Sequence, residues 1–239
     1  MRLRYVAYTS PGIGKTRNED AVMGEASLGL FAVADGVGST GAAALAARHA
    51  VAALREHLLD LLTREEPPDI QRALTEGVQA AHARVRQLSR REGVSAASTL
   101  LVARIEREWL TLAHVGDGAA WIWRGDVLER VSGGDALSDL AMAEGFGRLH
   151  RAEKGLLDAV GAGDRIPTPR LAQRRWYAFD WLVLATDGIV ERLTGPAIES
   201  LVAEAAREHR PESLPERLVR TAQDAGARDD CTVLVAWRP

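Results

Sequence analysis

Two long segments carry apolar side chains with the period of an α-helix. In residues 41–62, alanine and leucine recur at intervals of three and four and form one broad apolar face. Pro67 and Pro68 then break the chain, and Asp69 is placed to serve as the N-cap of a second helix. Apolar residues keep the helical spacing without a slip over residues 70–88, which is the clearest helical pattern in the sequence. We interpret both apolar faces as parts of the core.

Short apolar runs bounded by turn residues predict strands elsewhere in the chain. The predicted strands are residues 3–10, 28–34, 98–106, 109–115, 119–124, 127–132, 181–187 and 231–237. The tripeptide at residues 124–126 fits a tight hairpin loop. Residues 133–175 are rich in Gly, Asp, Arg and Pro and only weakly periodic, so we expect helical fragments and loop there. Helices are expected again at about 196–208 and 211–224.

The order of these elements favours an α+β fold. Two helices, a series of strands of antiparallel type and then further helices imply sheets packed between helical layers. The 239 residues are enough for one large domain or two small ones, and the sequence shows neither an internal repeat nor a low-complexity tract.

Composition and charge exclude several classes of protein. The hydrophobic fraction of 46% and the charged fraction of 26% are those of an ordinary soluble globular protein. A formal net charge of −3 offers no overall basic surface, so we expect no nucleic-acid partner. The single cysteine, Cys231, excludes a disulfide within the chain and favours a reducing compartment. Charged residues interrupt the alanine-rich segment and the first residues lack a signal-peptide core, so we expect a cytoplasmic protein without a membrane span.

Three apolar runs end at an aspartate followed by a glycine. They are residues 30–36, 110–118 and 181–188, and each would place its carboxylate at the mouth of a sheet. Asp-Gly is ordinary turn chemistry, and a turn explains any single instance. Three coincident instances indicate instead that strands deliver carboxylates to one place, where their mutual repulsion calls for a cation.

Two further acidic pairs lie in similar settings. Glu19 and Asp20 fall between the first two predicted strands, and Asp229 and Asp230 stand immediately before the last one. Donor sets made only of oxygen suit Mg²⁺ or Mn²⁺ rather than zinc, and the six histidines form no HxH or HExxH pattern. The sequence also lacks an EF-hand loop and a P-loop in the correct frame.

Six motifs together resemble a known family. They are NEDA (18–21), LFAVADGVG (30–38), STLLVA (98–103), AHVGDG (113–118), LVLATDG (182–188) and RDDCTVLV (228–235). Their order and spacing resemble the type 2C family of metal-dependent protein serine/threonine phosphatases, bacterial branch. The resemblance implies a four-layer α-β-β-α sandwich, with two mainly antiparallel sheets flanked by helix pairs. It also implies a single phosphatase domain over residues 1–239, with a flap at about 132–155.

The resemblance further implies a centre of two Mn²⁺ or Mg²⁺ ions. Asp35 would bridge both ions and the carbonyl of Gly36 would bind the first, whereas Asp187 and Asp229 would bind the second. Glu19 and Asp20 would hold water of the metal shell, with direct ligation left open.

A third metal site is implied by the bacterial members. Asp117 resembles the acid that shares this site with Asp187. A flap carboxylate usually completes the site, and Asp135 and Asp139 are the two candidates.

The chain departs from the family pattern where phosphate and substrate would bind. Many members have an arginine four residues before the Glu of NED, where this chain has Lys15, with Arg17 two residues closer. Either side chain could anchor phosphate, although lysine lacks the bidentate fork of arginine. The sequence DGVGS replaces DGMGG, and the segment after Ser132 is short and rich in glycine. Substrate choice would depend on that flap.

The resemblance implies hydrolysis of phosphoserine and phosphothreonine in proteins by a metal-activated water, in a monomer that opposes a bacterial Ser/Thr kinase. Two alternatives remain open: a non-catalytic partner-binding or sensing module, and a phosphatase for a small phosphorylated metabolite. Because a binding module has no physical reason to keep like charges together, Asp35, Asp187 and Asp229 favour the enzyme.

Overall fold

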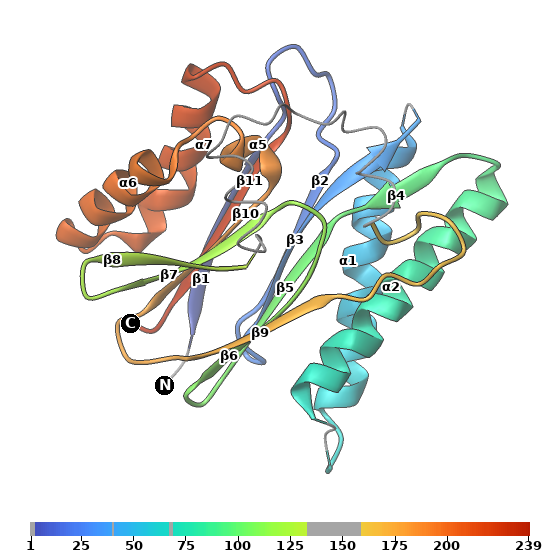
Figure 1. Ribbon diagram of the computed structural model, residues 1–239, viewed down its shortest axis with the longest axis horizontal. Coiled ribbons are helices and arrows are strands. Elements are labelled where there is room, and N and C mark those ends of the chain that lie inside the picture. Colours follow the sequence, from blue (N-terminus) through green and yellow to red (C-terminus); the bar gives the residue numbers. More distant parts are fainter. Residues whose placement is uncertain (1–2, 40, 67–68, 133–158) are drawn as a thin grey trace, which may run out of the picture.

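The computed structural model describes residues 3–39, 41–66, 69–132 and 159–239 (Figure 1). Along the chain, the elements are β1 (Arg4–Ser10), β2 (Asp20–Glu25), β3 (Leu30–Gly38), α1 (Ala42–Leu62), α2 (Ile70–Glu92), β4 (Ala96–Ser98), β5 (Leu100–Glu106), β6 (Trp109–Val115), β7 (Ala119–Arg124), β8 (Val127–Ser132), β9 (Arg170–Arg175), β10 (Trp181–Ala185), α5 (Asp187–Val190), α6 (Gly195–Arg207), a 3₁₀ turn (Pro211–Ser213), α7 (Leu214–Asp224) and β11 (Cys231–Trp237). None of the helices in these ranges is long and apolar enough to cross a membrane.

The strands form two antiparallel sheets that pack face to face. One sheet has the order β1-β11-β10-β7-β8, and the other has the order β2-β3-β5-β6-β9, with β4 paired to β3. Figure 1 shows α1 and α2 covering the second sheet, while α6 and α7 cover the first. The expected α+β fold, a four-layer α-β-β-α sandwich, is confirmed.

Three apolar layers hold this sandwich together. The layer between the sheets contains Phe31, Leu112 and Trp176, all fully or almost fully buried. A second layer joins α1 and α2 to their sheet, and a third joins α6 and α7 to the other sheet. Residues of β5 alternate between two of these layers, because successive side chains of a strand point to opposite faces.

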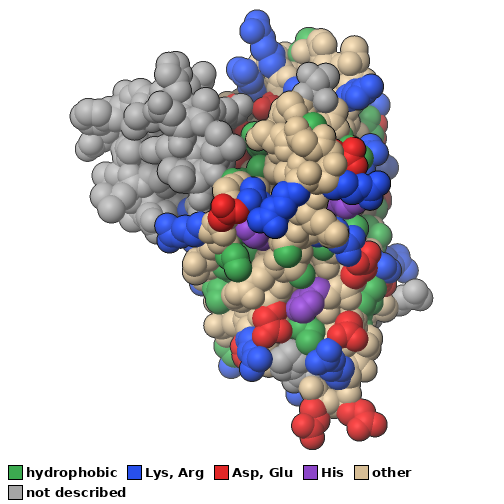
Figure 2. All heavy atoms as spheres, turned by 90° about the vertical axis from the view of Figure 1, so that its right-hand side faces the viewer, with side chains coloured by type: hydrophobic (Ala, Val, Ile, Leu, Met, Phe, Trp, Pro, Cys, Tyr) green, Lys and Arg blue, Asp and Glu red, His purple; other side chains and the backbone are tan. Residues whose placement is uncertain are grey.

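The two predicted N-terminal helices are confirmed as α1 and α2. Asp69 caps α2 as expected, since its carboxylate accepts hydrogen bonds from the backbone N–H groups of Gln71 and Arg72 at 3.0 and 3.2 Å. Such a cap stabilises a helix by about 0.5–2 kcal/mol. Gly77 lets α2 approach α1 closely, because a Cβ there would lie 2.9 Å from Cδ1 of Leu54. Seen from the side of α2, basic and acidic side chains are interspersed on the surface (Figure 2).

Two strands escaped the sequence-based prediction. The strand expected at 28–34 is β3 and runs over Leu30–Gly38, and Asp20 opens the additional strand β2 instead of lying between strands. The loop expected through 133–175 contains the strand β9. Its sequence RLAQRR has no apolar alternation because most of its side chains face solvent at the edge of the sheet.

Other boundaries differ in smaller ways. The strand predicted at 98–106 is β5, which begins at Leu100, whereas Ser98 ends the separate strand β4. The strand predicted at 181–187 ends at Ala185, after which Asp187 opens α5. The hairpin at 124–126 is confirmed: Gly125 and Asp126 both have positive φ, at 53° and 67°, as a type I′ turn requires. The strands predicted at 109–115, 119–124, 127–132 and 231–237 have those same bounds.

The topology brings the predicted acidic segments to one end of the sandwich. The ends of β3 and β10 and the starts of β2 and β11 meet there, because paired antiparallel strands run in opposite directions. The two chain termini lie at the opposite end (Figure 1).

Candidate metal centre

Four aspartates are buried at the end of the sandwich where these strands meet. The exposed fractions are 8% for Asp20, 9% for Asp35, 5% for Asp187 and 1% for Asp230. Asp20 and Asp35 are paired across β2 and β3. Buried carboxylates are rare unless hydrogen bonds, cations or protons stabilise them, so the cluster marks this end as a candidate site.

Hydrogen bonds fix both the N–H and the carbonyl group of Asp35. Its N–H donates to Oγ1 of Thr99 at 2.8 Å, and its carbonyl accepts from Oγ of Ser98 at 3.0 Å and from the N–H of Thr99 at 2.8 Å. These three bonds fix where β3 presents the Asp35 side chain.

Gly36 is required by the close approach of α1. Its N–H donates to the carbonyl of Glu19 at 3.1 Å, and a Cβ at Gly36 would lie 2.1 Å from the carbonyl oxygen of Ala43. No larger residue fits without moving the first turn of α1. The glycine after Asp35 is therefore a packing requirement of this site; it lies within β3, paired with Ser98 of β4, and the turn expected from the Asp-Gly dipeptide is wrong here.

Asp20 has one oxygen that is well satisfied and one that is not. Its Oδ2 accepts hydrogen bonds from the hydroxyls of Thr186 at 2.9 Å and Thr232 at 2.6 Å. Its Oδ1 is buried and accepts no hydrogen bond from the described part of the chain. Burial raises the pKa of Asp20 to about 7, and the charges of Asp230 and Asp187 act in the same direction.

Carboxylates from four other segments converge on Asp35. Its pKa lies well above the usual range, first because of burial and then because of the neighbouring charges of Asp187, Asp20, Asp229 and Asp117. A cation bound here would relieve this repulsion. The concentration of negative charge is the electrostatic signature of a divalent-metal site.

The remaining predicted acids lie at the rim. Asp229 and Glu19 are partly exposed, with side-chain exposures of 25% and 28%, and Asp117 is exposed in the turn between β6 and β7. Both flap candidates, Asp135 and Asp139, lie outside the described residues.

Lys15 is bound to carboxylates of the cluster. Its Nζ lies 2.6 Å from Oδ1 of Asp229, 3.2 Å from Oδ2 of Asp230 and 3.5 Å from Oε2 of Glu19. Burial by itself would lower the pKa of Lys15, but Asp229 and Asp230 outweigh it and raise that pKa. The ammonium group is therefore engaged in neutralising this end of the cluster.

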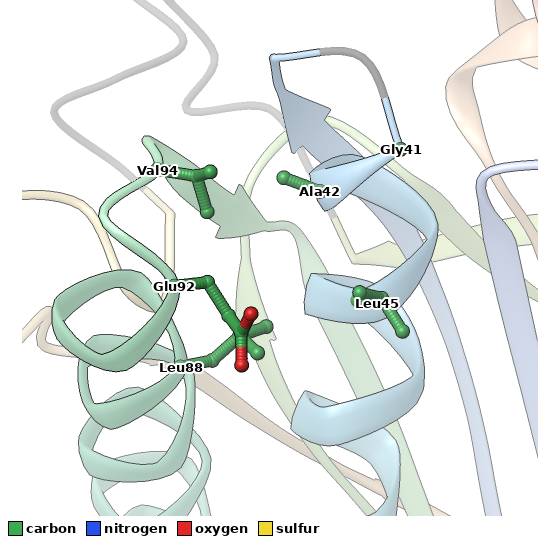
Figure 3. A pocket seen from close by; sticks show the side chains of 6 residues that line it. All are labelled: Gly41, Ala42, Leu45, Leu88, Glu92 and Val94. Atoms are coloured by element: carbon green, nitrogen blue, oxygen red, sulfur yellow. The ribbon is translucent and has the colours of Figure 1, made fainter.

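Arg17 has a different environment. It is exposed, with no ion pair to any described residue, and its Nη1 lies 3.2 Å from the position a Cβ would take on Gly41. Gly41 also lines a hollow of about 180 Å³ between the start of α1 and the end of α2 (Figure 3). That hollow is apolar except for Glu92.

The donor chemistry fits Mg²⁺ or Mn²⁺. The cluster offers carboxylate oxygens, and Oδ1 of Asp20 is an orphaned acceptor within it. In the described ranges, no group of three or more His, Cys, Asp or Glu side chains is placed so that it could hold a metal ion by itself. Mg²⁺ usually keeps several waters and uses only one or two carboxylates, so a complete protein cage is not needed.

Two threonines that support this site were missed by the sequence analysis, which named Asp230 only as one of an acidic pair. Thr186 and Thr232 hold Asp20, and the N–H of Thr232 also donates to Oγ1 of Thr186 at 3.0 Å. Asp230 accepts hydrogen bonds from the N–H groups of Gly12 at 2.9 Å and Glu19 at 2.7 Å. Threonine inside the otherwise apolar segments LVLAT and CTVLVAW was the available signal.

Comparison with curated proteins shows clear relatives. The serine/threonine protein phosphatase PstP of Mycobacterium tuberculosis is 28% identical over 243 residues, which cover 98% of this chain and 45% of PstP. The probable protein phosphatase 1N of Homo sapiens is 29% identical over 235 residues, which cover 88% of this chain and 54% of that protein. The chain thus spans about half the length of these curated relatives.

Solved structures with the same fold match almost the whole of this chain. The catalytic domain of PstP in complex with two manganese ions has a TM-score of 0.79 at 27% identity, covering 98% of this chain and 97% of that one. PppA of Pseudomonas aeruginosa has a TM-score of 0.82 at 25% identity, with coverages of 99% and 98%. A family model described as Protein phosphatase 2C matches residues 13–221. The chain therefore belongs to the protein phosphatase 2C family.

Proposed function

We propose that this chain hydrolyses phosphoserine and phosphothreonine in proteins at a centre of two Mn²⁺ or Mg²⁺ ions. Family membership supports the proposal, as does similarity to PstP, which is named a serine/threonine protein phosphatase and whose catalytic domain was solved with two manganese ions. The observation in this chain that carries it is the convergence of carboxylates on the buried Asp35, whose pKa they raise.

Four residues are proposed to hold the two ions. Asp35 would bridge them, the carbonyl of Gly36 would bind one, and Asp187 and Asp229 would bind the other. Asp117 is the proposed ligand of a third ion, together with Asp187. When bound, the ions supply an activated water nucleophile and offset the charge on the phosphoryl oxygens.

The chain's own side chains would orient water and substrate. Oδ1 of Asp20 accepts no hydrogen bond from the described residues, and two threonine hydroxyls orient the carboxylate, so it is prepared to accept a hydrogen bond from an ordered water. Glu19 would do the same from the rim. Lys15 is already paired with Asp229 and Asp230. We therefore propose that Arg17 binds the substrate phosphate, because its guanidinium offers a bidentate fork.

Further proposals concern the domain organisation, oligomeric state, location and partners. We propose a single phosphatase domain over residues 1–239 that acts as a monomer in the cytoplasm. Its partners would be proteins phosphorylated by a Ser/Thr kinase, which the phosphatase opposes.

A phosphopeptide assay tests the proposal. With manganese, peptides carrying phosphoserine or phosphothreonine should release phosphate faster than the matched phosphotyrosine peptide, and EDTA should abolish release. Full activity in EDTA would contradict a metal-dependent reaction. Turnover of small phosphorylated metabolites without turnover of any phosphopeptide would overturn the substrate class, and phosphopeptide binding without turnover would identify a binding module.

A further inference from the structure

A second cavity, with a mostly polar lining, lies at the opposite end of the sandwich from the acidic cluster. It has a volume of about 280 Å³ and is formed by the turn between β2 and β3, the turn between β5 and β6, and Arg238 after β11. Leu30, at the start of β3, lies next to this turn, and Asp35 lies five residues further along the strand. At about 3.3 Å per residue, this separates the cavity from the metal centre by roughly 15–20 Å.

The charged side chains of this cavity are mostly arginine. Arg104, Arg107 and Arg238 line it, and Glu106 is the one acidic side chain among the described residues that do so. The Glu106 side chain is 56% exposed, so much of its charge is screened by solvent. The cavity therefore has an excess of positive charge in a protein whose overall charge is negative.

Arg104 is unusual because it is an arginine inside the protein. It is 9% exposed, and it lies on β5 between Leu30 of β3 and Thr111 of β6. Its Nη2 donates to Oε1 of Glu106 at 3.0 Å, but its Nε is buried and donates to no acceptor in the described chain. Burial lowers the pKa of Arg104, which Glu106 only partly opposes. An arginine this deeply buried is normally paired on both edges of its fork.

Arg238, which also lines the cavity, likewise has one paired and one unpaired nitrogen. One of its Nη groups donates to the carbonyl of Arg107, whereas its Nε is buried and has no acceptor among the described residues. Arg104 on β5 and Arg238 after β11 thus both line the cavity, and each has a buried Nε–H group without an acceptor among the described residues. Ser27 also lines the cavity, but its hydroxyl donates to Oε1 of Glu25 at 2.8 Å.

We propose that this cavity, formed around Arg104, Arg107 and Arg238, binds a small oxyanion of the phosphate class. A phosphate group presents several acceptor oxygens to the guanidinium groups that line the cavity and offsets the excess positive charge. The volume is slightly below the roughly 300–1,000 Å³ of typical small-molecule sites, which favours a single anionic group over a nucleotide. The ligand is either free orthophosphate or the phosphoryl group of a small phosphorylated compound. This site is independent of the metal centre.

Residue-resolved titration tests this site without interference from the metal centre. Inorganic phosphate is titrated into the ¹⁵N-labelled full chain, loaded with Mg²⁺ and kept at constant ionic strength with sodium chloride. We expect saturable amide shifts at Ser27, Gly29 and Arg107. These shifts are read separately from any at Gly36 and Gly188, where phosphate could reach the metals. Phosphoserine in a parallel titration distinguishes a phosphoryl group from free phosphate, and binding of either supports the site.

Matched variants identify the arginines that bind. Arg238→Gln and Arg107→Gln should each weaken binding on the order of tenfold, whereas Arg220→Gln, an exposed arginine of α7, should leave it unchanged. All three variants should keep the wild-type melting temperature and manganese-dependent hydrolysis, which shows that they fold. Shifts that are absent, that never saturate, or that are equal in Arg238→Gln, Arg107→Gln and the wild type would overturn the proposal. This result would leave the phosphatase proposal untouched.

Discussion

Asp20 and Asp35 face each other as paired residues of adjacent antiparallel strands, and both are more than nine-tenths buried. Like charges placed directly opposite each other destabilise a sheet. Burial and neighbouring acids raise the pKa of both carboxyl groups. Keeping these groups charged therefore destabilises the fold when no metal is bound. The arrangement is understandable in a protein that recovers this free energy by binding cations.

The first prediction concerns this repulsion. Asp35→Asn removes one charge while preserving shape, so it should raise the melting temperature in EDTA by a few degrees, roughly 1 kcal/mol of stability. The same change should reduce manganese-dependent hydrolysis by about a hundredfold or more, because the proposed bridging ligand is lost. Calorimetry with and without manganese, combined with a phosphopeptide assay, measures both effects. A variant that is less stable in EDTA and nearly fully active would refute the assignment of Asp35.

The second prediction separates Arg17 from Lys15. Arg17→Ala should raise KM for a phosphopeptide about tenfold with little change in kcat, because it removes the proposed contact to the bound phosphate. Lys15→Ala should instead lower the melting temperature in EDTA, since it leaves Asp229 and Asp230 without their ammonium partner. Manganese should restore much of that loss. If Lys15→Ala raises KM more than Arg17→Ala does, the two roles must be exchanged.

The third prediction concerns His82 on α2. Its Nδ1 accepts a hydrogen bond from the N–H of Gly161 at 3.1 Å, and burial lowers the pKa of His82 below its usual 6.5, with Arg86 adding to the effect and Asp164 opposing it. Protonation is therefore easier in the unfolded chain. The stability should be complete above pH 6.5 and should fall as the pH drops below that value.

Urea unfolding between pH 5 and 8 measures this effect. The wild type should lose up to about 1.4 kcal/mol per pH unit more than His82→Gln on the acid side. Glutamine retains an acceptor for Gly161 but does not titrate. Equal slopes in the two proteins would show that His82 does not couple folding to pH.

The fourth prediction compares two glycines. Gly36→Ala places a Cβ 2.1 Å from the carbonyl oxygen of Ala43 and should destabilise the fold by roughly 1–3 kcal/mol. Gly195→Ala, at the start of α6, meets no atom within 4 Å and should be neutral or slightly stabilising, by up to about 1 kcal/mol. Denaturant unfolding of both variants measures the difference, and equal stabilities would contradict the packing argument for Gly36.

Sequence periodicity alone determined the elements that bury one clear face. The helix α2, with its Asp69 cap, and the hairpin at 124–126 were predicted correctly, because local spacing and turn chemistry specify them. The strands β2 and β9 were not predicted, since β9 is an exposed edge strand and β2 shows no clean alternation. The order of six motifs was enough to indicate the family and its sandwich.

Tertiary structure alone decided how the acids are arranged. The sequence showed that Asp20 and Asp35 are acidic, but only the β2–β3 register places them opposite each other, because strand pairing depends on contacts between distant residues. Likewise, neither the threonines that hold Asp20 nor the ion pairs of Lys15 follow from local spacing. The metal-ligand roles of Asp187, Asp229 and Asp117 stay predictions. The sequence gives the types of ligand residue, whereas burial and strand register determine the electrostatic environment of these carboxylates.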